Sequence, residues 1–166
     1  PFFLLFLALL LAGMAASAQD FADRAGIEAV PPPDGPVVLS SFEYPRIRAV
    51  PVARGLSHPW ALAFRQNGDI LVTERDKGTL RVVRDGQLLE GSVPGVPEVY
   101  TGVRRAGLMD IAIHPEDDSL VYLTYSKAAE LDPSEEAPDW AYEGQSGSNV
   151  ALARGRLDGG ALTEVR

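Results

Sequence analysis

Cysteine is absent from the 166-residue sequence, and histidine occurs only at positions 58 and 114. The lack of cysteine excludes disulfides, thiolate nucleophiles, zinc fingers and iron–sulfur clusters from these residues. Two histidines argue against a metal centre built on histidine. The sequence therefore predicts no metal ligand in this part of the protein.

Basic residues are also scarce, since 15 Lys and Arg face 23 Asp and Glu, and the formal net charge is −8. Phosphate contacts need clustered Lys and Arg, so we expect no nucleic-acid partner. The composition is 46% hydrophobic and 23% charged, which is typical of a folded globular chain and argues against disorder.

Long apolar runs are missing except at the start, where residues 2–12 are all apolar. This run is too short to cross a bilayer of about 30 Å as a helix, but it suits the hydrophobic region of a signal peptide. The Ala16-Ser17-Ala18 sequence is a cleavage pattern that would leave Gln19 as the mature start. We expect a signal peptide over residues 1–18 with its basic start truncated, and a periplasmic or secreted protein without membrane contact. An uncleaved anchor is the alternative.

Proline dominates the next segment, residues 19–51, which contains Pro31, Pro32, Pro33, Pro36 and Pro45. Proline removes backbone donors and favours extended polyproline geometry. The pattern predicts a Pro-rich linker or arm rather than part of a core.

From residue 52 onwards the pattern indicates an antiparallel meander. Strands are predicted at 61–64, 70–74 and 80–84, separated by turn sequences at 66–69, 75–78 and 85–86. A second set follows, with strands at 108–114, 120–124 and 150–159 and a turn from Pro115 to Asp118.

The second set repeats the first. Ala63 and Ala112 are 49 positions apart, Thr73 and Thr124 are 51 apart, and Leu157-Asp158-Gly159 matches Arg84-Asp85-Gly86. A period near fifty residues with about four strands per unit predicts a β-propeller blade. A β-sandwich spaces strands similarly but gives no reason for self-similarity. We predict an all-β fold with about two blades over residues 52–166, and we expect a longer protein because propellers use typically four to eight blades.

Few residues are candidates for chemistry. His58 precedes Pro59, so we expect it to be extended, and His114 should end a strand at a turn; we expect neither to activate a nucleophile. The acidic residues Glu116, Asp117 and Asp118, and those from 130 to 139, lack the spacing of an EF-hand and are interpreted as solvated turns.

Two further features are candidates for ligand binding. The long segment 126–148 carries Trp140 and Tyr142, which are candidates for covering a pocket, although an ordinary surface loop is the alternative. Arg104 and Arg105, followed by a permissive Gly107, are the best candidates for binding a carboxylate through bidentate hydrogen bonds. Two solvated charges are the alternative.

An ordered series of segments carries a family resemblance: GLSHPWALAF (55–64), NGDILVTER (67–75), LRVV (80–83), VPGVPEV (93–99), GLMDIAIHP (107–115) and ALARGRLDG (151–159). The series resembles the N-terminal part of the soluble PQQ-dependent aldose sugar dehydrogenases, also called the glucose/sorbosone dehydrogenase family. The similarity covers residues 52–166. It implies a six-bladed propeller that binds pyrroloquinoline quinone (PQQ) and Ca²⁺ and oxidises aldoses at the anomeric carbon to lactones.

The resemblance also implies partners and site residues. A sugar substrate and an electron acceptor are the expected partners; the sequence does not specify the oligomeric state. Arg105 stands where the family has a glutamine near the cofactor and sugar, and Arg104 precedes it, so both are predicted cofactor contacts. The family's catalytic histidine motif matches neither histidine here and is expected after Arg166, so no catalytic residue is predicted.

Two alternatives remain open at this stage. The first is a non-catalytic extracytoplasmic propeller that binds carbohydrate or protein, which the Arg105 replacement would mark as having lost its cofactor. The second is a metal-dependent lactonase-like propeller, which would need Glu, Asn and Asp ligands converging on the propeller axis.

Overall fold

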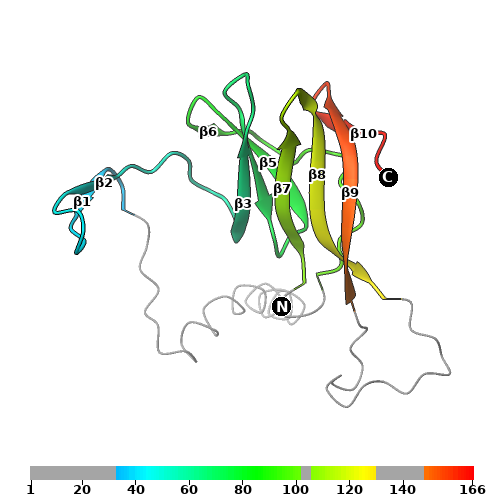
Figure 1. The fold of residues 1–166 in the computed structure, drawn as a ribbon, viewed down its shortest axis with the longest axis horizontal. Helices are drawn as coiled ribbons and strands as arrows, with labels where there is room; N and C mark the ends of the chain where they lie inside the picture. The colour runs from blue at the N-terminus through cyan, green and yellow to red at the C-terminus, as the bar shows by residue number, and fades with distance from the viewer. Residues whose placement is uncertain (1–32, 102–105, 130–147) are drawn as a thin grey trace, which may run out of the picture. The chain divides into compact units, whose positions relative to one another are not determined.

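The computed structural model describes residues 33–101, 106–129 and 148–166. These residues form ten strands in three antiparallel sheets (Figure 1). No helix in the described part of the chain is long and apolar enough to cross a membrane. The strands are β1 (Val37–Leu39), β2 (Ile47–Ala49), β3 (Pro59–Phe64), β4 (Ile70–Glu74), β5 (Thr79–Arg84), β6 (Gln87–Leu88), β7 (Leu108–His114), β8 (Asp117–Ala128), β9 (Ser148–Asp158) and β10 (Ala161–Thr163).

The chain divides into two compact units between Pro51 and Val52, and each is described separately. In the first unit, β1 and β2 form a two-stranded hairpin in which Val37 pairs with Ala49. The hydroxyl of Ser41 accepts a hydrogen bond from the backbone N–H of Tyr44 and closes the connecting loop at 3.0 Å. These strands were not predicted, because two three-residue strands between prolines leave no detectable alternation.

In the second unit, β3, β4, β5 and β6 form a meander, as predicted for residues 61–84. The β5–β6 hairpin turns at Asp85 and Gly86, whose φ angles are 49° and 74°. Two consecutive positive φ angles match the right-handed twist of the flanking strands, which explains the Asp-Gly sequence at this position.

Strands β7 to β10 form a second meander of four strands. The predicted turn from Pro115 to Asp118 is too long, because β8 begins at Asp117. Both carboxylates are paired with arginines: Asp117 lies 2.9 Å from Arg156, and Asp118 lies 2.9 Å from Arg65. These ion pairs hold both carboxylates in the sheet and leave only two residues for the turn.

The two sheets share details that confirm the repeat. Each first strand has a register shift, between Pro59 and Leu62 in β3 and between Leu108 and Ile111 in β7. At each bulge a backbone N–H donates a hydrogen bond to a threonine hydroxyl. The Ala61 N–H donates to Thr73 at 3.0 Å, and the Asp110 N–H donates to Thr124 at 2.9 Å. The repeated template supports the predicted propeller blades over a β-sandwich.

The structure corrects one detail of the repeat. Counted from Thr73 and Thr124, the strand pairing matches Arg84 with Arg156 rather than with Leu157. The β9–β10 hairpin turns at Gly159 and Gly160, whose φ angles are both positive. Strand β9 thus continues two residues further than β5, and this extension hides the true register in the sequence.

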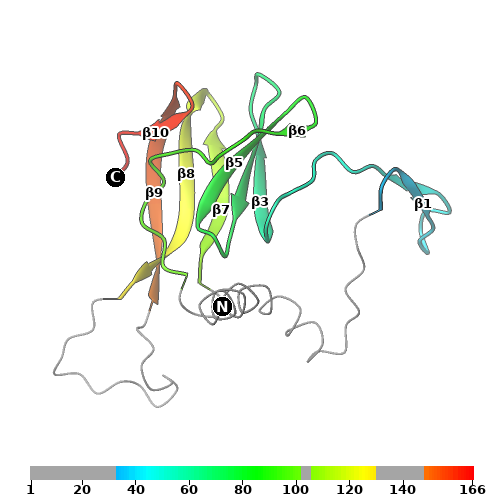
Figure 2. The same ribbon diagram turned by 180° about the vertical axis from the view of Figure 1, so that it is seen from behind.

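The core lies between the two sheets, where β3 and β7 contact each other (Figures 1 and 2). It contains Leu71, Leu80, Val93, Leu108, Ile111, Val121, Leu123, Leu157 and Leu162. Buried Thr73 also joins the sheets, because its hydroxyl donates to the Met109 carbonyl at 2.7 Å. Residues 89–101 connect the two sheets. Along this connection, the Val93 N–H donates to the Leu80 carbonyl of the first sheet, and the Tyr100 N–H donates to the Ser126 carbonyl of the second.

Candidate functional site

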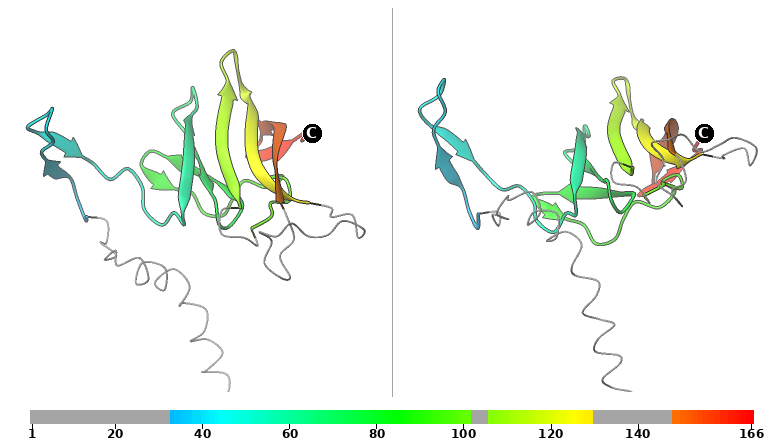
Figure 3. Two further views of the ribbon diagram at one scale, coloured as in Figure 1. Left: turned by 60° about the horizontal axis from the view of Figure 1, so that its bottom comes forward. Right: turned by 90° about the horizontal axis from the view of Figure 1, so that it is seen from below.

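The two ends of the sheets differ in composition. The hairpin turns β3–β4, β5–β6, β7–β8 and β9–β10 lie at one end, at the top of Figure 1, which we call the hairpin end; the β3–β4 and β7–β8 turns are also at the top of the left view of Figure 3. At the opposite end β3 and β7 begin and β4 turns into β5. We call this second end the rim; the predicted cofactor contacts Arg104 and Arg105 precede the strand that begins there.

His58 lies at the rim in an unexpected conformation. The prediction of an extended residue is wrong, because its φ is 46°. Three contacts hold this conformation: Ser57 N–H donates to Glu74 at 2.6 Å, Arg75 N–H donates to the His58 carbonyl at 3.1 Å, and His58 Nδ1 lies 3.3 Å from Asp76. A non-glycine residue with positive φ is strained and persists only where its surroundings enforce it.

Arg75 links the other side chains at the rim. Its Nε donates to Asp76 at 2.6 Å, and its guanidinium carbon lies 5.2 Å from the centre of the Trp60 ring. The hydrogen bond from Arg75 lowers the pKa of Asp76, and burial opposes this effect. Asp76 is therefore ionised at neutral pH. We call His58, Trp60, Arg75 and Asp76 the rim cluster.

Glu74 is completely buried and accepts the hydrogen bond from the Ser57 N–H, next to His58 of the rim cluster. Burial alone would raise its pKa, but hydrogen bonds from Ser57 N–H, Thr79 and Arg81 outweigh burial and lower the pKa. The Arg81 guanidinium also donates to the Leu89 carbonyl at 3.0 Å. Glu74 thus acts as an ionised anchor for the backbone that leads into His58.

The rim cluster does not form a serine–histidine–aspartate triad. Ser57, which the sequence analysis overlooked, has its hydroxyl 3.4 Å from His58, but this contact is to Nδ1, the same nitrogen that faces Asp76. A triad requires the acid and the nucleophile on opposite ring nitrogens. The expectation that His58 activates no nucleophile is thus supported by its geometry.

Gly107 begins the second sheet at the rim. Its N–H donates to the Ser126 hydroxyl at 3.2 Å, and its carbonyl accepts from Ser126 N–H at 2.9 Å. A Cβ at this position would overlap the Arg75 carbonyl oxygen, so only glycine allows this approach. Gly107 therefore allows the start of the second sheet to approach Arg75 of the first sheet closely.

A pocket of ≈ 560 Å³ lies at the same end of the second sheet. It is lined by Glu98, Val99, Tyr100, Thr101, Tyr125, Lys127, Ala128 and Ala129. Arg104 and Arg105 lie outside the described residues, and so do Trp140 and Tyr142. Thr101 and Ala129, which directly precede the two undescribed segments, both line this pocket.

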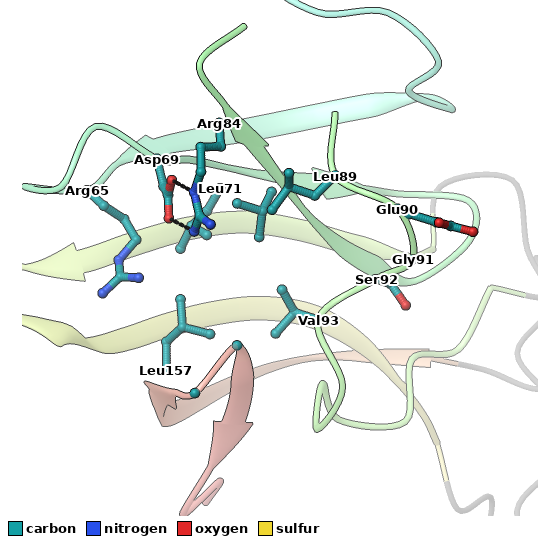
Figure 4. A pocket seen from close by; sticks show the side chains of 13 residues that line it. Arg65, Asp69, Leu71, Arg84, Leu89, Glu90, Gly91, Ser92, Val93 and Leu157 are labelled. Carbon is teal, nitrogen blue, oxygen red and sulfur yellow. Dashed lines mark hydrogen bonds and ion pairs between the residues drawn. The ribbon is translucent and has the colours of Figure 1, made fainter. Parts of the chain in front are cut away.

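A second pocket, of ≈ 360 Å³, lies at the hairpin end (Figure 4). Its floor is apolar, with Leu71, Val93 and Leu157, and its wall carries an ion pair in which Arg84 binds both carboxylate oxygens of Asp69 at 2.7 Å. This hydrogen bonding lowers the pKa of Asp69 to about 2 against the effect of burial. Arg65, Asp69 and Arg84 are engaged in ion pairs, which suits a structural role, whereas Glu90 also lines the pocket without such a partner among the described residues.

The remaining sequence candidates have structural roles. His114 ends β7 as predicted, and its Nδ1 accepts from the Glu116 N–H at 3.2 Å. No three His, Asp or Glu side chains gather as a metal site within residues 33–101, 106–129 and 148–166. The sequence analysis missed Ser57, Trp60, Arg75, Asp76 and Ser126 as rim residues, because their proximity depends on strand pairing rather than on a motif.

A family model described as "Glucose / Sorbosone dehydrogenase" matches residues 56–166. An uncharacterized protein of Synechocystis sp. (strain ATCC 27184 / PCC 6803 / Kazusa) is 36% identical over 154 residues, which cover 87% of this chain and 34% of that protein. Aldose sugar dehydrogenase YliI of Escherichia coli (strain K12) is 31% identical over 114 residues, which cover 67% of this chain and 27% of that protein. The chain thus spans about a third of the length of these relatives.

Solved structures show the same similarity. The chain matches the PQQ-bound form of aldose sugar dehydrogenase from Streptomyces coelicolor with a TM-score of 0.52 and 25% identity. That match covers 82% of this chain and 34% of the other. Together with the two four-stranded meanders, this similarity identifies the fold as part of a sugar dehydrogenase-like propeller.

Proposed function

Because the chain belongs to the glucose/sorbosone dehydrogenase family, we propose that it supplies two blades of an exported PQQ-dependent sugar dehydrogenase. The reaction is the oxidation of an aldose at its anomeric carbon to a lactone, with electrons passed to a separate acceptor. The family match carries this proposal, and we place the ligand at the rim.

We place part of the PQQ site at the rim. In support, Gly107 lies so close to Arg75 that a side chain at position 107 would not fit, and Arg104 and Arg105 precede it in the sequence. PQQ carries three carboxylates, and Arg104 and Arg105 would bind one or two of them through charge-assisted hydrogen bonds. When bound, PQQ supplies the two-electron acceptor for the sugar.

The remaining parts of the proposed site are not assigned to described residues. No described residue is assigned to Ca²⁺, which would act as a Lewis acid on the quinone. The base that takes the sugar hydroxyl proton is expected beyond Arg166. Residues 1–18 would direct the protein to the periplasm or the medium, where a reaction with external sugars is possible.

Reconstitution of the full gene product tests the proposal. Purified protein incubated with PQQ and Ca²⁺ should reduce an artificial electron acceptor when an aldose is added, and the product should be the corresponding lactone. Samples without PQQ, and samples treated with a chelator, serve as controls. Failure to bind PQQ in the presence of Ca²⁺ would contradict the proposal.

One observation favours a second candidate, a non-catalytic propeller. Arg105 replaces the glutamine that the family carries near its cofactor, and this change could mark a lost cofactor site. The two candidates differ in the same titration: the dehydrogenase binds PQQ, whereas the non-catalytic propeller binds a carbohydrate or protein without PQQ.

A further inference from the structure

His58 and Gly107 occupy equivalent positions in the two sheets. They directly precede Pro59 and Leu108, the first residues of β3 and β7. Their carbonyls accept equivalent hydrogen bonds, from Arg75 N–H at 3.1 Å and from Ser126 N–H at 2.9 Å. Both residues have positive φ, 46° for His58 and 149° for Gly107. The two φ values are different positive-φ conformations, and glycine can adopt either of them without strain.

The first sheet nevertheless has histidine at this position. A side chain with positive φ costs free energy, so it is retained where it contributes something other than stability. The ring is not buried for packing, because the side chain is 49% exposed. Its fixed contacts are polar and come from Asp76 and Ser57.

The contact with Asp76 determines which ring nitrogen is available. Arg75 holds Asp76 as a carboxylate, and an ionised carboxylate accepts a hydrogen bond. In the neutral imidazole, Asp76 therefore places the proton on Nδ1 and leaves a lone pair on Nε2. No residue in the described ranges hydrogen-bonds Nε2, so this acceptor is open to a ligand.

A sugar hydroxyl is the group that this acceptor fits. Hydroxyls donate hydrogen bonds, and a neutral polyol is not repelled by a site where Arg75 and Asp76 neutralise each other. His58 also lies at the rim, where the proposed function places the cofactor and the anomeric carbon of the substrate. The acceptor is held rigidly, since the backbone on both sides of His58 is fixed by Glu74 and Arg75.

We propose that His58 is a specificity-determining residue, whose Nε2 accepts a hydrogen bond from a hydroxyl of the aldose while Asp76 orients the ring. This proposal rests on the proposed function and assigns a residue to its substrate. Asp76 is a positioning residue, because it acts only through His58.

His58→Gly is the most informative variant, because glycine adopts the required φ and should leave folding intact. In the PQQ-loaded full gene product, the KM for the best aldose should rise about 3- to 10-fold, the effect of one lost neutral hydrogen bond. The kcat and the affinity for PQQ should stay within about twofold. His114→Ala at the hairpin end is the matched control and should leave all three values unchanged.

Deoxy sugars identify the contact directly. One deoxy aldose should have a higher KM than its parent with the wild-type protein, but the same KM as its parent with His58→Gly. Asp76→Asn should raise the KM like His58→Gly, because an asparagine amide can donate to Nδ1 and turn Nε2 into a donor. It should have no further effect in the His58→Gly protein, which a merely structural role would not explain.

The outcomes separate the two proposals. If the wild-type protein oxidises the aldose and His58→Gly has the same KM as wild type, the assignment of His58 is overturned but the proposed function is not. The assignment would also be overturned if every deoxy sugar raised the KM by the same factor in the wild-type protein and in His58→Gly. The absence of aldose oxidation by the wild-type protein would overturn the proposed function, and the assignment of His58 with it.

Discussion

At the hairpin end, each sheet has an arginine–aspartate pair built on an equivalent arginine: Arg84 pairs with Asp69 in the first sheet, and Arg156 pairs with Asp117 in the second, although the two aspartates are not at equivalent positions. At the rim, equivalent positions differ, since His58 corresponds to Gly107 and Arg75 to Ser126. The arginine is common to both sheets, and in each sheet it forms an ion pair that stabilises the fold. The residues that diverge at the rim are those that the template does not require, and they are the ones available for binding.

The largest expected effect concerns the two equivalent rim positions. Gly107→Ala should lower the free energy of unfolding by roughly 2–5 kcal/mol, because the methyl group overlaps the Arg75 carbonyl and φ is unfavourable. His58→Gly should stay within about 1 kcal/mol of wild type, since it relieves strain. Urea denaturation of the full gene product measures both. Equal destabilisation by the two changes would break the equivalence of these positions.

A smaller effect concerns the two ion pairs at the hairpin end. Asp69 is 3% exposed and has a pKa of about 2, so Asp69→Asn should cost at most about 2 kcal/mol at pH 7. The ionised form stabilises the fold above the ordinary pKa of 3.8, and this contribution is lost as the pH falls towards 2. The gap between wild type and variant in urea denaturation should therefore close between pH 5 and about pH 2.

Asp117→Asn is the matched comparison for Asp69. The side chain of Asp117 is 37% exposed, so solvent screens its ion pair with Arg156. The variant should lose less stability than Asp69→Asn and show a weaker dependence on pH. A larger loss at Asp117 than at Asp69 would show that burial does not set the strength of these two pairs.

Much of the fold was predictable from the sequence, because the information is local. Alternating apolar residues and Asn-Gly or Asp-Gly turns placed β3, β4, β5 and β7 within two residues of their observed bounds. The repeat in Thr73 and Thr124 indicated two equivalent sheets, and the same threonines bond the two bulges. The strands β1 and β2 were missed because each is only three residues long.

The rim was less predictable, because it is assembled from residues that are distant in sequence. Pro59 suggested an extended His58, yet the hydrogen bonds from Ser57 N–H to Glu74 and from Arg75 N–H to the His58 carbonyl enforce a positive φ. Asp117 and Asp118 read as solvated acids because their arginine partners lie 39 and 53 residues away. Predicted contacts at Arg104 and Arg105 remain predictions, since they lie outside the described residues.

A PQQ titration of the full gene product in the presence of Ca²⁺ tests the central claim most directly, with Arg105→Ala as the variant and Arg48→Ala as the charge-matched control. Arg48 lies on exposed β2, outside the propeller unit, and should not affect binding. The account predicts that Arg105→Ala weakens PQQ binding roughly 10- to 150-fold, as expected for 1.5–3 kcal/mol from a hydrogen bond to a charged group. An affinity equal to that of wild type and of Arg48→Ala would show that Arg105 is a solvated surface charge, and would contradict the assignment of this rim to the cofactor.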